Sequence, residues 1–378
     1  MHIRTSAAIA VLAATSLLAA CGSGGGTTTA AGGGAGPSGT KAQTALAPYL
    51  QPPTALPVSK PLSTTPPPGK QVYFLSDGIG LSQTIYSGFQ AASKELGWTA
   101  HVQTWDAANP ATLNSAMLSA VNAGADAVAF VAMDAAAIKE GLKAAQDKHV
   151  IVVGAATGNK PGTAGISAEV NSALVAGVTR GKMIGLGIAA AAEKSGTAAH
   201  VVNVTAPVYS SILEPTDDGV ASTLKEYCAS CSFDNLNIAA ADLFAGKVPQ
   251  LVVSYLQAHP DTNTISIRAA GLMQNGLVAA LKAAGLPSIA IYGDSPLEAQ
   301  IGELQKGDAT GYTGNPLAVQ GWQIVDAIAR EVVDGNGDVY SSADAPEWWL
   351  TTDTKLSSAQ PEFPAGYEAQ FKKLWKLP

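Results

Sequence analysis

Charged side chains are scarce in this chain of 378 residues, since Asp, Glu, Lys and Arg together make up 13% of it. From Lys70 onward the chain holds all 29 acidic residues but only 19 of the 22 basic ones, a net charge of −10. Binding to nucleic acid depends on clustered Lys and Arg, so this balance argues against such a partner. The 47% of hydrophobic residues predict a domain with a large core.

Side chains that could carry catalysis or hold a metal are also few. The five His residues are scattered without the spacing of metal ligands, and neither a nucleophile elbow nor a phosphate loop occurs. The segment from Gly78 to Gln83 half-matches the dinucleotide fingerprint, with Asp106 at the distance of a ribose-binding acid. Gln83 stands where the third glycine belongs. We therefore predict no cofactor, no metal and no enzymatic activity.

The start of the chain has the features of an export signal. His2 and Arg4 precede an apolar stretch that ends in Leu18-Ala19-Ala20-Cys21, which predicts a signal peptide over residues 1–20. A transmembrane helix is the alternative, but the apolar core is shorter than the roughly 20 residues that span a bilayer, and glycines follow it. The motif resembles the bacterial lipobox. That resemblance implies a lipid on Cys21 that anchors the mature protein to the membrane outside the cytoplasm.

Residues 21–69 consist mainly of Gly, Thr, Ser, Ala and Pro, with Lys41 and Lys60 as the only charged side chains. A segment of this composition does not bury a core of its own. Its glycine-rich first half favours a flexible chain, and its later prolines favour extended backbone. We predict a tether that holds a domain off the membrane. In an alternative interpretation, Tyr49 and Leu50 pack onto the domain surface.

From Lys70 onward, short apolar runs alternate with segments of helical periodicity. In the first half, Val72–Leu75 is a predicted strand, and further strands follow at 100–104, 127–131 and 150–153. A second series begins at Asn171 with a long Ala-rich helix, followed by strands at 200–204, 236–238, 264–267 and 290–292. Apolar strands that alternate with helices are typical of parallel sheets covered on both faces. The fold class predicted is α/β, with two doubly wound parallel-sheet lobes.

Two of the three cysteines stand close together. Cys228 and Cys231 have the spacing of a redox motif, but they follow a helix, whereas a redox motif opens one. With Cys21 lipidated, these two can pair in an oxidising compartment. We predict a structural disulfide between Cys228 and Cys231, with a redox centre as the alternative.

Between roughly Lys70 and Val333 several local motifs follow one another: Ser76-Asp77-Gly78, the segment Ala91–Trp98, Ala107-Ala108-Asn109-Pro110, the segment Gly124–Val128, Ala258-His259-Pro260-Asp261, Gly293-Asp294-Ser295-Pro296 and Gln320-Gly321-Trp322. Their order and spacing resemble those of the ribose-type (type I) periplasmic binding proteins of ABC transporters.

The resemblance implies a hinge of three chain crossings between the lobes. They fall near Val170-Asn171, Asn315-Pro316 and Ala343-Asp344. Residues 70–171 plus 316–343 then form the N-terminal lobe, and residues 172–315 plus 344–378 form the C-terminal lobe. We predict that Trp348-Trp349 and Trp375 pack as a final strand and a closing helix against the second lobe. A docking surface for a partner is the alternative interpretation of these tryptophans.

Ligands of open α/β sheets bind beyond the carboxyl ends of the strands. This rule and the family resemblance together give nine candidate ligand-binding residues: Ser76, Ser82, Gln83, Trp105 and Asp134 from the first lobe, and Tyr209, Arg268, Asp294 and Asn315 from the second. Trp105 offers a face for stacking on a ligand, or caps the edge of its lobe. Ser82 and Gln83 are equally ordinary polar residues of a helix start. Arg268 binds ligand or forms an ion pair.

One departure from the family pattern bears on the ligand. After the fourth strand, sugar-binding members carry an Asp-Arg pair, whereas this chain has Ala155-Ala156. Bidentate polar recognition of a hexose or pentose is weakened by this change. A polyol, a modified sugar or a less polar solute therefore competes with a simple sugar as the expected ligand.

The resemblance implies a monomeric solute-binding lipoprotein of an ABC importer, which closes its lobes on a small molecule and is then recognised by permease subunits in the membrane. A sensory receptor that presents its closed form to a membrane kinase fits the same sequence. An exported enzyme is the more distant alternative.

Overall fold

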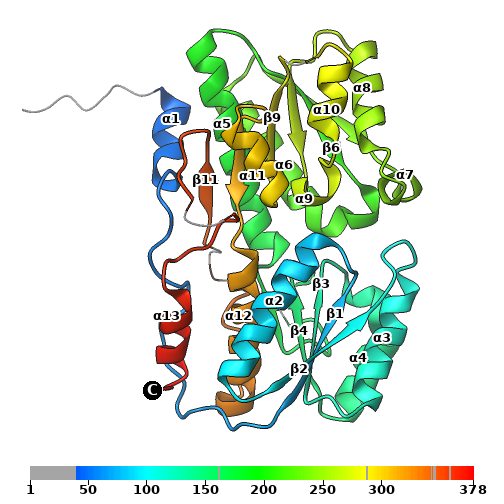
Figure 1. Cartoon of the computed structure of the whole chain (residues 1–378), viewed down its shortest axis with the longest axis vertical. Coiled ribbons are helices and arrows are strands. Elements are labelled where there is room, and N and C mark those ends of the chain that lie inside the picture. Colours follow the sequence, from blue (N-terminus) through cyan, green and yellow to red (C-terminus); the bar gives the residue numbers. More distant parts are fainter. Residues whose placement is uncertain (1–39, 161, 287, 342, 344–345, 357–358) are drawn as a thin grey trace, which may run out of the picture. The chain divides into compact units, whose positions relative to one another are not determined.

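The computed structural model describes residues 40–160, 162–286, 288–341, 343, 346–356 and 359–378, and it has two lobes, each built on its own sheet (Figure 1). The predicted signal peptide, Cys21 and residues 21–39 lie outside the described residues. The sheet of the first lobe is wholly parallel, in the order β2-β1-β3-β4-β5. Its strands are β1 (Gln71–Ser76), β2 (Thr99–Thr104), β3 (Ala127–Val131), β4 (Ile151–Ala155) and β5 (Ala168–Val170).

Helices cover both faces of the first sheet, as an all-parallel sheet requires. They are α2 (Gly80–Glu95), α3 (Ala111–Asn122), η2 (Ala135–Ile138), α4 (Lys139–Asp147) and α12 (Leu317–Asp334). The last of these comes from far along the chain and packs closely against α2. A Cβ at Gly88 would overlap the backbone of Ala318, and one at Gly321 would overlap the backbone of Ile85. Glycine at both positions therefore allows the two helices to touch through their backbones.

The second lobe repeats the plan with one added strand. Its sheet has the order β11-β10-β9-β8-β6-β7, parallel except for the edge strand β11. The strands are β6 (His200–Thr205), β7 (Ser232–Asn237), β8 (Thr264–Ile267), β9 (Ala290–Asp294), β10 (Gly311–Gly314) and β11 (Trp348–Leu350). In both lobes the second strand lies at one edge, beside the first. The predicted fold class of two doubly wound α/β lobes is confirmed.

The helices of the second lobe include one of membrane-spanning length. They are η3 (Ala173–Gly177), α5 (Val178–Ser195), η4 (Pro207–Tyr209), α6 (Ser210–Tyr227), α7 (Ala240–Phe244), α8 (Val248–Ala258), α9 (Ala270–Met273), α10 (Leu277–Ala283) and α11 (Glu298–Gln305). Within the described residues, only Ala173–Ser195 is long and apolar enough to cross a bilayer, and 72% of its most apolar window is buried. This helix is a core helix of the lobe.

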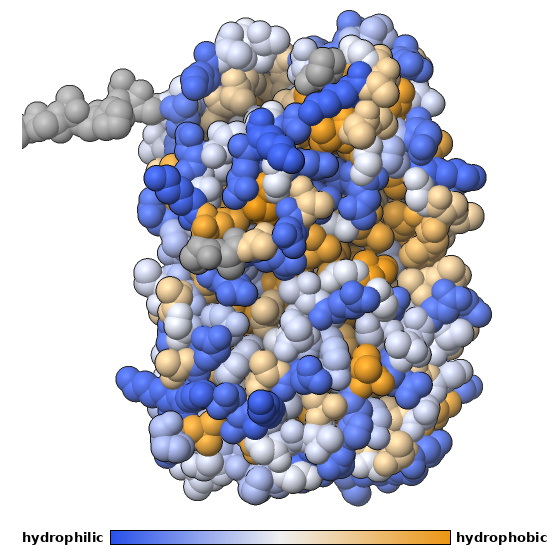
Figure 2. Space-filling view, viewed as in Figure 1, coloured by the Kyte–Doolittle hydropathy of each residue, from blue (hydrophilic) through white to orange (hydrophobic). Residues whose placement is uncertain are grey.

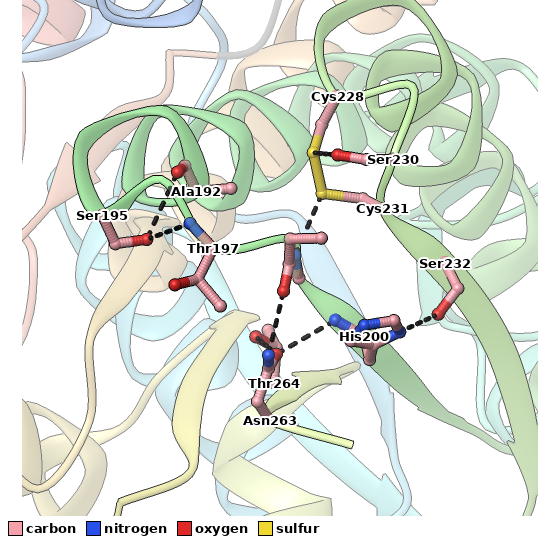
Figure 3. Close-up of a disulfide and its surroundings, with 12 residues drawn as sticks. Ala192, Ser195, Thr197, His200, Cys228, Ser230, Cys231, Ser232, Asn263 and Thr264 are labelled. Carbon is pink, nitrogen blue, oxygen red and sulfur yellow. Dashed lines mark hydrogen bonds between the residues drawn. A yellow bond between two sulfur atoms is a disulfide. The ribbon is translucent and has the colours of Figure 1, made fainter. Parts of the chain in front are cut away.

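A disulfide joins the end of α6 to the start of β7 (Figure 3). Cys228 and Cys231 are bonded across a turn in which the Cys231 N–H also donates to the Cys228 carbonyl at 2.9 Å. The Cys231 sulfur accepts from the Ala199 N–H at 3.2 Å, next to the first residue of β6, His200. The bond therefore closes a loop at the edge of the second sheet.

Residues 40–69, which we call the N-terminal strap, pack along both lobes. In the second lobe, α1 (Lys41–Leu46) lies on α5 and buries Ala42 and Leu46; a short turn, η1 (Ala47–Tyr49), follows it. Farther along, Leu56 and Leu62 are buried in the apolar cluster of the first lobe. The prediction of a free tether up to residue 69 is wrong for this segment, because scattered apolar residues find grooves already formed by the two lobes.

The C-terminal helix α13 (Tyr367–Leu374) belongs to the first lobe (Figure 1). Trp375 stacks on Trp322 of α12, with ring centroids 5.5 Å apart and planes 5° from parallel. Its indole N–H donates to Asp326 at 2.7 Å. The predicted final strand is present as β11 in the second lobe, but the prediction that the closing helix packs there is wrong. After β11 the chain returns from the second lobe to the first, where α13 packs.

Within the described residues, the chain passes from β5 to η3 at Asn171 and from β10 to α12 at Asn315-Pro316, where the first two crossings are predicted. Residues 335–341, 343 and 346–347 belong to the third connection, from α12 to β11, and Asp344 of the third predicted crossing lies outside the described residues. The strap packs on both lobes, and the described residues of 351–366 lead from β11 to α13.

The packing of the strap gives a first testable prediction. Leu62 is 1% exposed and its N–H donates to the Leu374 carbonyl at 2.9 Å, whereas Leu50 is 45% exposed. Leu62→Ala should lower the free energy of unfolding by about 2–3 kcal/mol, because it leaves a cavity between the strap and α13. Leu50→Ala should change it by less than about 0.5 kcal/mol. Urea unfolding measures both, and equal small effects would show that the strap is not part of the folded domain.

Candidate functional site

A cavity of about 120 Å³ lies between the lobes, at the carboxyl ends of the strands of both sheets. A single water needs about 10–15 Å³ on the same measure, so the space holds a small organic solute. Chain segments following β1, β3 and β4 line it from the first lobe, and segments following β6, β8 and β9 line it from the second. Figure 2 shows apolar surface on the second lobe along its border with the first.

Polar groups gather where the hinge crossings border the cavity. Asn171 and Asn315 lie in the first two crossings, and Arg180 and Gln320 follow in the first turns of α5 and α12. The Arg180 guanidinium donates to Glu347 at 2.7 Å and to the Asn171 side-chain carbonyl at 2.6 Å. The Asn171 amide nitrogen and both amide atoms of Gln320 have no hydrogen-bond partner among the described residues. These buried groups are available to a solute.

Glu347, in the third crossing, is buried behind Arg180. Burial raises its pKa to about 7, the charge of Arg180 lowers it, and the nearby Asp294 raises it. Arg180 and Glu347 thus form an ion pair that is almost completely buried from water.

A buried ion cluster supports the wall of the second lobe. Arg268 is fully buried and lies 3.3 Å from Asp217 and 3.2 Å from Asp294, and it also donates to Ser266. The other oxygen of Asp294 accepts from the Ala269 N–H at 2.8 Å. Burial raises the pKa of Asp217, and the positive charge of Arg268 offsets only part of this rise. One guanidinium thus serves two carboxylates, and Asp294 is fixed where it borders the cavity.

Asp77 and Tyr209 face the cavity from opposite lobes. Asp77 accepts from the Ile79 N–H at 3.0 Å, and burial raises its pKa while a hydrogen bond from Ser82 lowers it. Burial raises the pKa of the Tyr209 hydroxyl, and the charge of Asp77 raises it further. The hydroxyl has no partner among the described residues. After Asn171 and Gln320, Tyr209 is a third residue with an available hydrogen-bonding group, and it comes from the second lobe.

The lobes also touch beside the cavity. A Cβ at Gly158, after β4 of the first lobe, would lie 2.8 Å from the Ser211 Cβ of the second and still closer to its carbonyl oxygen. A Cβ at Gly271 in the second lobe would lie 3.1 Å from a methyl of Leu81 in the first. The structure therefore has its lobes closed. Within the part of the chain described, no group of three His, Cys, Asp or Glu side chains is arranged to hold a metal ion.

Residues 74–336, well over half of the chain, match the model of the periplasmic binding protein domain family. This chain belongs to the periplasmic binding protein family. The closed pair of lobes around a cavity agrees with the ribose-type (type I) group that the sequence motifs predicted. No curated protein sequence matches this periplasmic binding protein.

Several solved structures share the fold of this periplasmic binding protein. GanP, a glucose-galactose binding protein from Geobacillus stearothermophilus, is 20% identical, with a TM-score of 0.64 over 76% of this chain and 99% of GanP. A carbohydrate transporter from Acidothermus cellulolyticus 11B, in complex with myo-inositol, is 20% identical, with a TM-score of 0.58 over 82% and 99% of the two chains. A solute-binding protein from Agrobacterium vitis with bound allitol is 16% identical, with a TM-score of 0.63 over 76% and 96%. At these identities the likeness shows the fold alone.

Four of the nine candidate binding residues line the cavity of this periplasmic binding protein: Ser82, Tyr209, Asp294 and Asn315. Arg268 lies behind the wall in the ion cluster, which was the alternative considered for it. Trp105 is 7% exposed and packs in the apolar core rather than in the cavity lining, because β2 is an edge strand and its following loop turns back onto α3.

The remaining three candidates point elsewhere. Ser76 accepts from the Gly78 N–H at 3.1 Å within its own turn, and Gln83 donates to the Gly78 carbonyl at 2.8 Å from an exposed position. Asp134 precedes η2 outside the cavity lining. Ser76 and Gln83 thus stabilise the turn at Gly78, whereas the Asp134 side chain makes no capping hydrogen bond to η2.

Six polar lining residues were missed by sequence reasoning: Asp77, Asn171, Arg180, Thr216, Ser295 and Gln320. Four of them stand in the motifs or crossings named above, but the motifs do not reveal which side chain turns inward. Arg180 and Thr216 had no such marker, although Arg180 lies in the first turn of α5, the helix that follows the first crossing.

Glu169, on β5 just before the first crossing, is a buried acid near the hinge. Its carboxylate accepts from the Thr157 hydroxyl at 2.7 Å, and its N–H donates to Asp338 in the third crossing at 3.2 Å. Burial raises its pKa to about 7, hydrogen bonds from Thr157 and Asn159 lower it, and the charges of Asp338 and Asp134 raise it. The group binds a proton in the folded state at a pH where the unfolded chain has released it.

This raised pKa predicts a pH dependence of stability. The stabilisation by protonated Glu169 is present below about pH 4.5 and is lost as the pH rises to about 7. Glu169→Gln has no carboxyl to titrate, so it does not lose this stabilisation as the pH rises. The free energy of unfolding of the variant minus that of wild type should therefore increase by about 2–3 kcal/mol between pH 4.5 and 8. Urea unfolding at several pH values measures the difference, with the exposed Glu214→Gln as the control. A difference that stays constant with pH would contradict the assignment.

Proposed function

We propose that this protein is the solute-binding component of an ABC importer and that the interlobe cavity is its binding site for a sugar, a polyol or a related small solute. The observation that carries the proposal is the interlobe cavity itself, lined from both lobes and supplied with buried amide and hydroxyl groups that lack a partner among the described residues. Groups of this kind bind water when the space is free of solute, and a solute that fits displaces that water and takes over its hydrogen bonds.

The solved relatives support the class of solute. GanP is a glucose-galactose binding protein, and the other two structures hold myo-inositol and allitol. All of these solutes are neutral and rich in hydroxyls. The cavity fits such solutes in size and in its mixture of carboxylate, amide and hydroxyl groups. We carry this class over as part of the proposal.

Membership of the family implies a location outside the cytoplasm and a partner in the membrane. In our proposal the lipid on Cys21 anchors the protein, the strap leaves the surface of the domain at its second lobe, and permease subunits recognise the closed lobes. The disulfide between Cys228 and Cys231 suits the oxidising conditions of such a compartment.

Ligand binding should raise the melting temperature. At 100 times its dissociation constant, one bound solute stabilises the folded state by about 2.7 kcal/mol, which corresponds to a rise of about 5 °C in a domain of this size. The protein is screened by thermal melting against sugars, polyols, amino acids and small aromatic acids, after any co-purified solute has been identified by mass spectrometry of the denatured sample. The absence of both a retained solute and any thermal shift would remove the proposal.

The contact at Gly158 allows closure to be tested separately from stability. Gly158→Leu places a side chain against Ser211 in the closed form only, and the backbone of Gly158 does not lie in the left-handed region. The apparent affinity for the solute should fall by about tenfold or more, because the closed form becomes rare. The matched control is Gly302→Leu, since a Cβ at Gly302 meets nothing within 4 Å. Unchanged affinity in Gly158→Leu would show that binding does not need this closure.

A further inference from the structure

The lining of the cavity is divided into a polar part and a largely apolar part. The amide and guanidinium groups of the lining all come from the hinge crossings or the helical turns next to them: Asn171, Arg180, Asn315 and Gln320. Most of the apolar side chains come from helices that follow the strand ends: Leu81 and Ile85 from α2, Ile212 and Leu213 from α6, and Leu272 from α9, with Ile79, Val131, Leu317 and small alanines beside them. The same walls carry a few polar side chains, which are Asp77, Ser82, Tyr209, Thr216, Asp294 and Ser295. A solute in this space meets the amide groups on its hinge side and mainly aliphatic surface elsewhere.

The free hydrogen-bonding capacity is concentrated at the hinge. Gln320 is 1% exposed and both its amide atoms lack a partner among the described residues, as does the amide nitrogen of Asn171, which is 7% exposed. Because the Asn171 carbonyl accepts from Arg180, its amide nitrogen is the group left for a solute. The hinge side therefore offers two amide nitrogens, each with two N–H groups, and one acceptor oxygen.

The acidic groups on the walls are largely engaged by their own lobes. Asp294 accepts from Arg268 and from the Ala269 N–H, and Asp77 accepts from Ile79 and Ser82. The Tyr209 hydroxyl is fully buried without a partner in the described chain, and Thr216 and Ser295 add two further hydroxyls to the lining, in which Tyr209 is the one aromatic residue. A solute with hydroxyls around its whole edge would leave several of them against Ile212, Leu272 and Leu81 without partners. Each such hydroxyl lowers affinity by about tenfold.

We propose that the solute of this cavity is a neutral, partly hydroxylated ring: its hydroxyls lie on one edge toward the hinge, and its opposite edge is methyl or methylene, as in a deoxy sugar. Ala155-Ala156 adds to the apolar part of the lining, because Ala156 presents a methyl group to the cavity where sugar-binding members carry a charged pair. This inference rests on the proposed function of the cavity as a solute site and narrows the class of solute.

Sugars that differ by a single hydroxyl test the inference. Isothermal titration calorimetry compares L-fucose with L-galactose and L-rhamnose with L-mannose, each pair differing only in a methyl group against a hydroxymethyl group. The expected result is tighter binding of the deoxy member, by about tenfold, in at least one pair. Tighter binding of the hydroxylated member, or no binding of any of the four, would overturn the inference.

Two variants show which side of the cavity sets the preference. Leu272→Asn adds a polar group to the apolar wall at a partly exposed position, so it should improve binding of the hydroxylated member relative to the deoxy member. Gln320→Leu removes the hinge amide at similar volume and should weaken both members of a pair by about tenfold or more. Leu174→Asn, the same change at a leucine that is 39% exposed outside the cavity, is the control. A preference that Leu272→Asn leaves unchanged would overturn the assignment of the apolar wall.

Failure of this inference and failure of the proposed function give different results. If the retained solute is fully hydroxylated and Gly158→Leu weakens its binding, the deoxy class is rejected. The binding function of the cavity then stands. The absence of any retained solute and of any closure rejects both.

Discussion

The ion pair between Arg180 and Glu347 holds together the parts of the chain that form the polar side of the cavity. Arg180 begins the helix after the first crossing, Glu347 ends the third, and the Arg180 side chain also fixes Asn171 in the first. Removing one member of such a buried pair costs about 3–5 kcal/mol, because the other charge remains without a partner. The arrangement of the hinge amides, and hence the hydrogen bonds offered to a solute, depends on this pair remaining intact.

The lobes and the hinge have different physical tasks. Each lobe is a parallel sheet covered by helices, with a core of aliphatic residues that keeps it rigid during closure. The strap buries Leu56 and Leu62 against the first lobe, whereas Phe363, in the segment before α13, packs on Trp348 of β11 in the second lobe. The stacked Trp322 and Trp375, anchored by Asp326, tie the last helix to α12, which begins at the second crossing. Rotation of one lobe against the other therefore moves α13 with the first lobe and changes the path of the strap between α1 and Leu56, because the strap packs on both lobes.

Most of the fold could be predicted from the sequence, since strands such as Ala127–Val131 and Thr264–Ile267 are short apolar runs with clear limits. The strand β5 and the strap were harder. Ala168–Val170 is three residues long and contains Glu169, whose carboxyl is buried through hydrogen bonds that no local pattern reveals. The strap has no periodicity, because Leu56 and Leu62 fit grooves formed by distant helices.

The site was predicted less completely for a related reason. Strand-end loops identify the region, so Asp294 and Asn315 could be found, but the inward turn of a side chain depends on tertiary contacts. Arg268 and Trp105 illustrate this limit: Arg268 is held by Asp217, which comes from another helix, and Trp105 packs into the core. Gln320 and Arg180 reach the cavity from helices rather than from loops.

The central claim is that one solute is enclosed between the closed lobes, with its polar groups on the hinge amides. A crystal structure of the protein with the solute retained during purification tests it most directly. The account predicts the solute inside the cavity, hydrogen-bonded to Gln320 and Asn171, with Gly158 against Ser211. A solute bound on the outer surface, or lobes that hold the same contacts with no solute between them at saturating concentration, would contradict it.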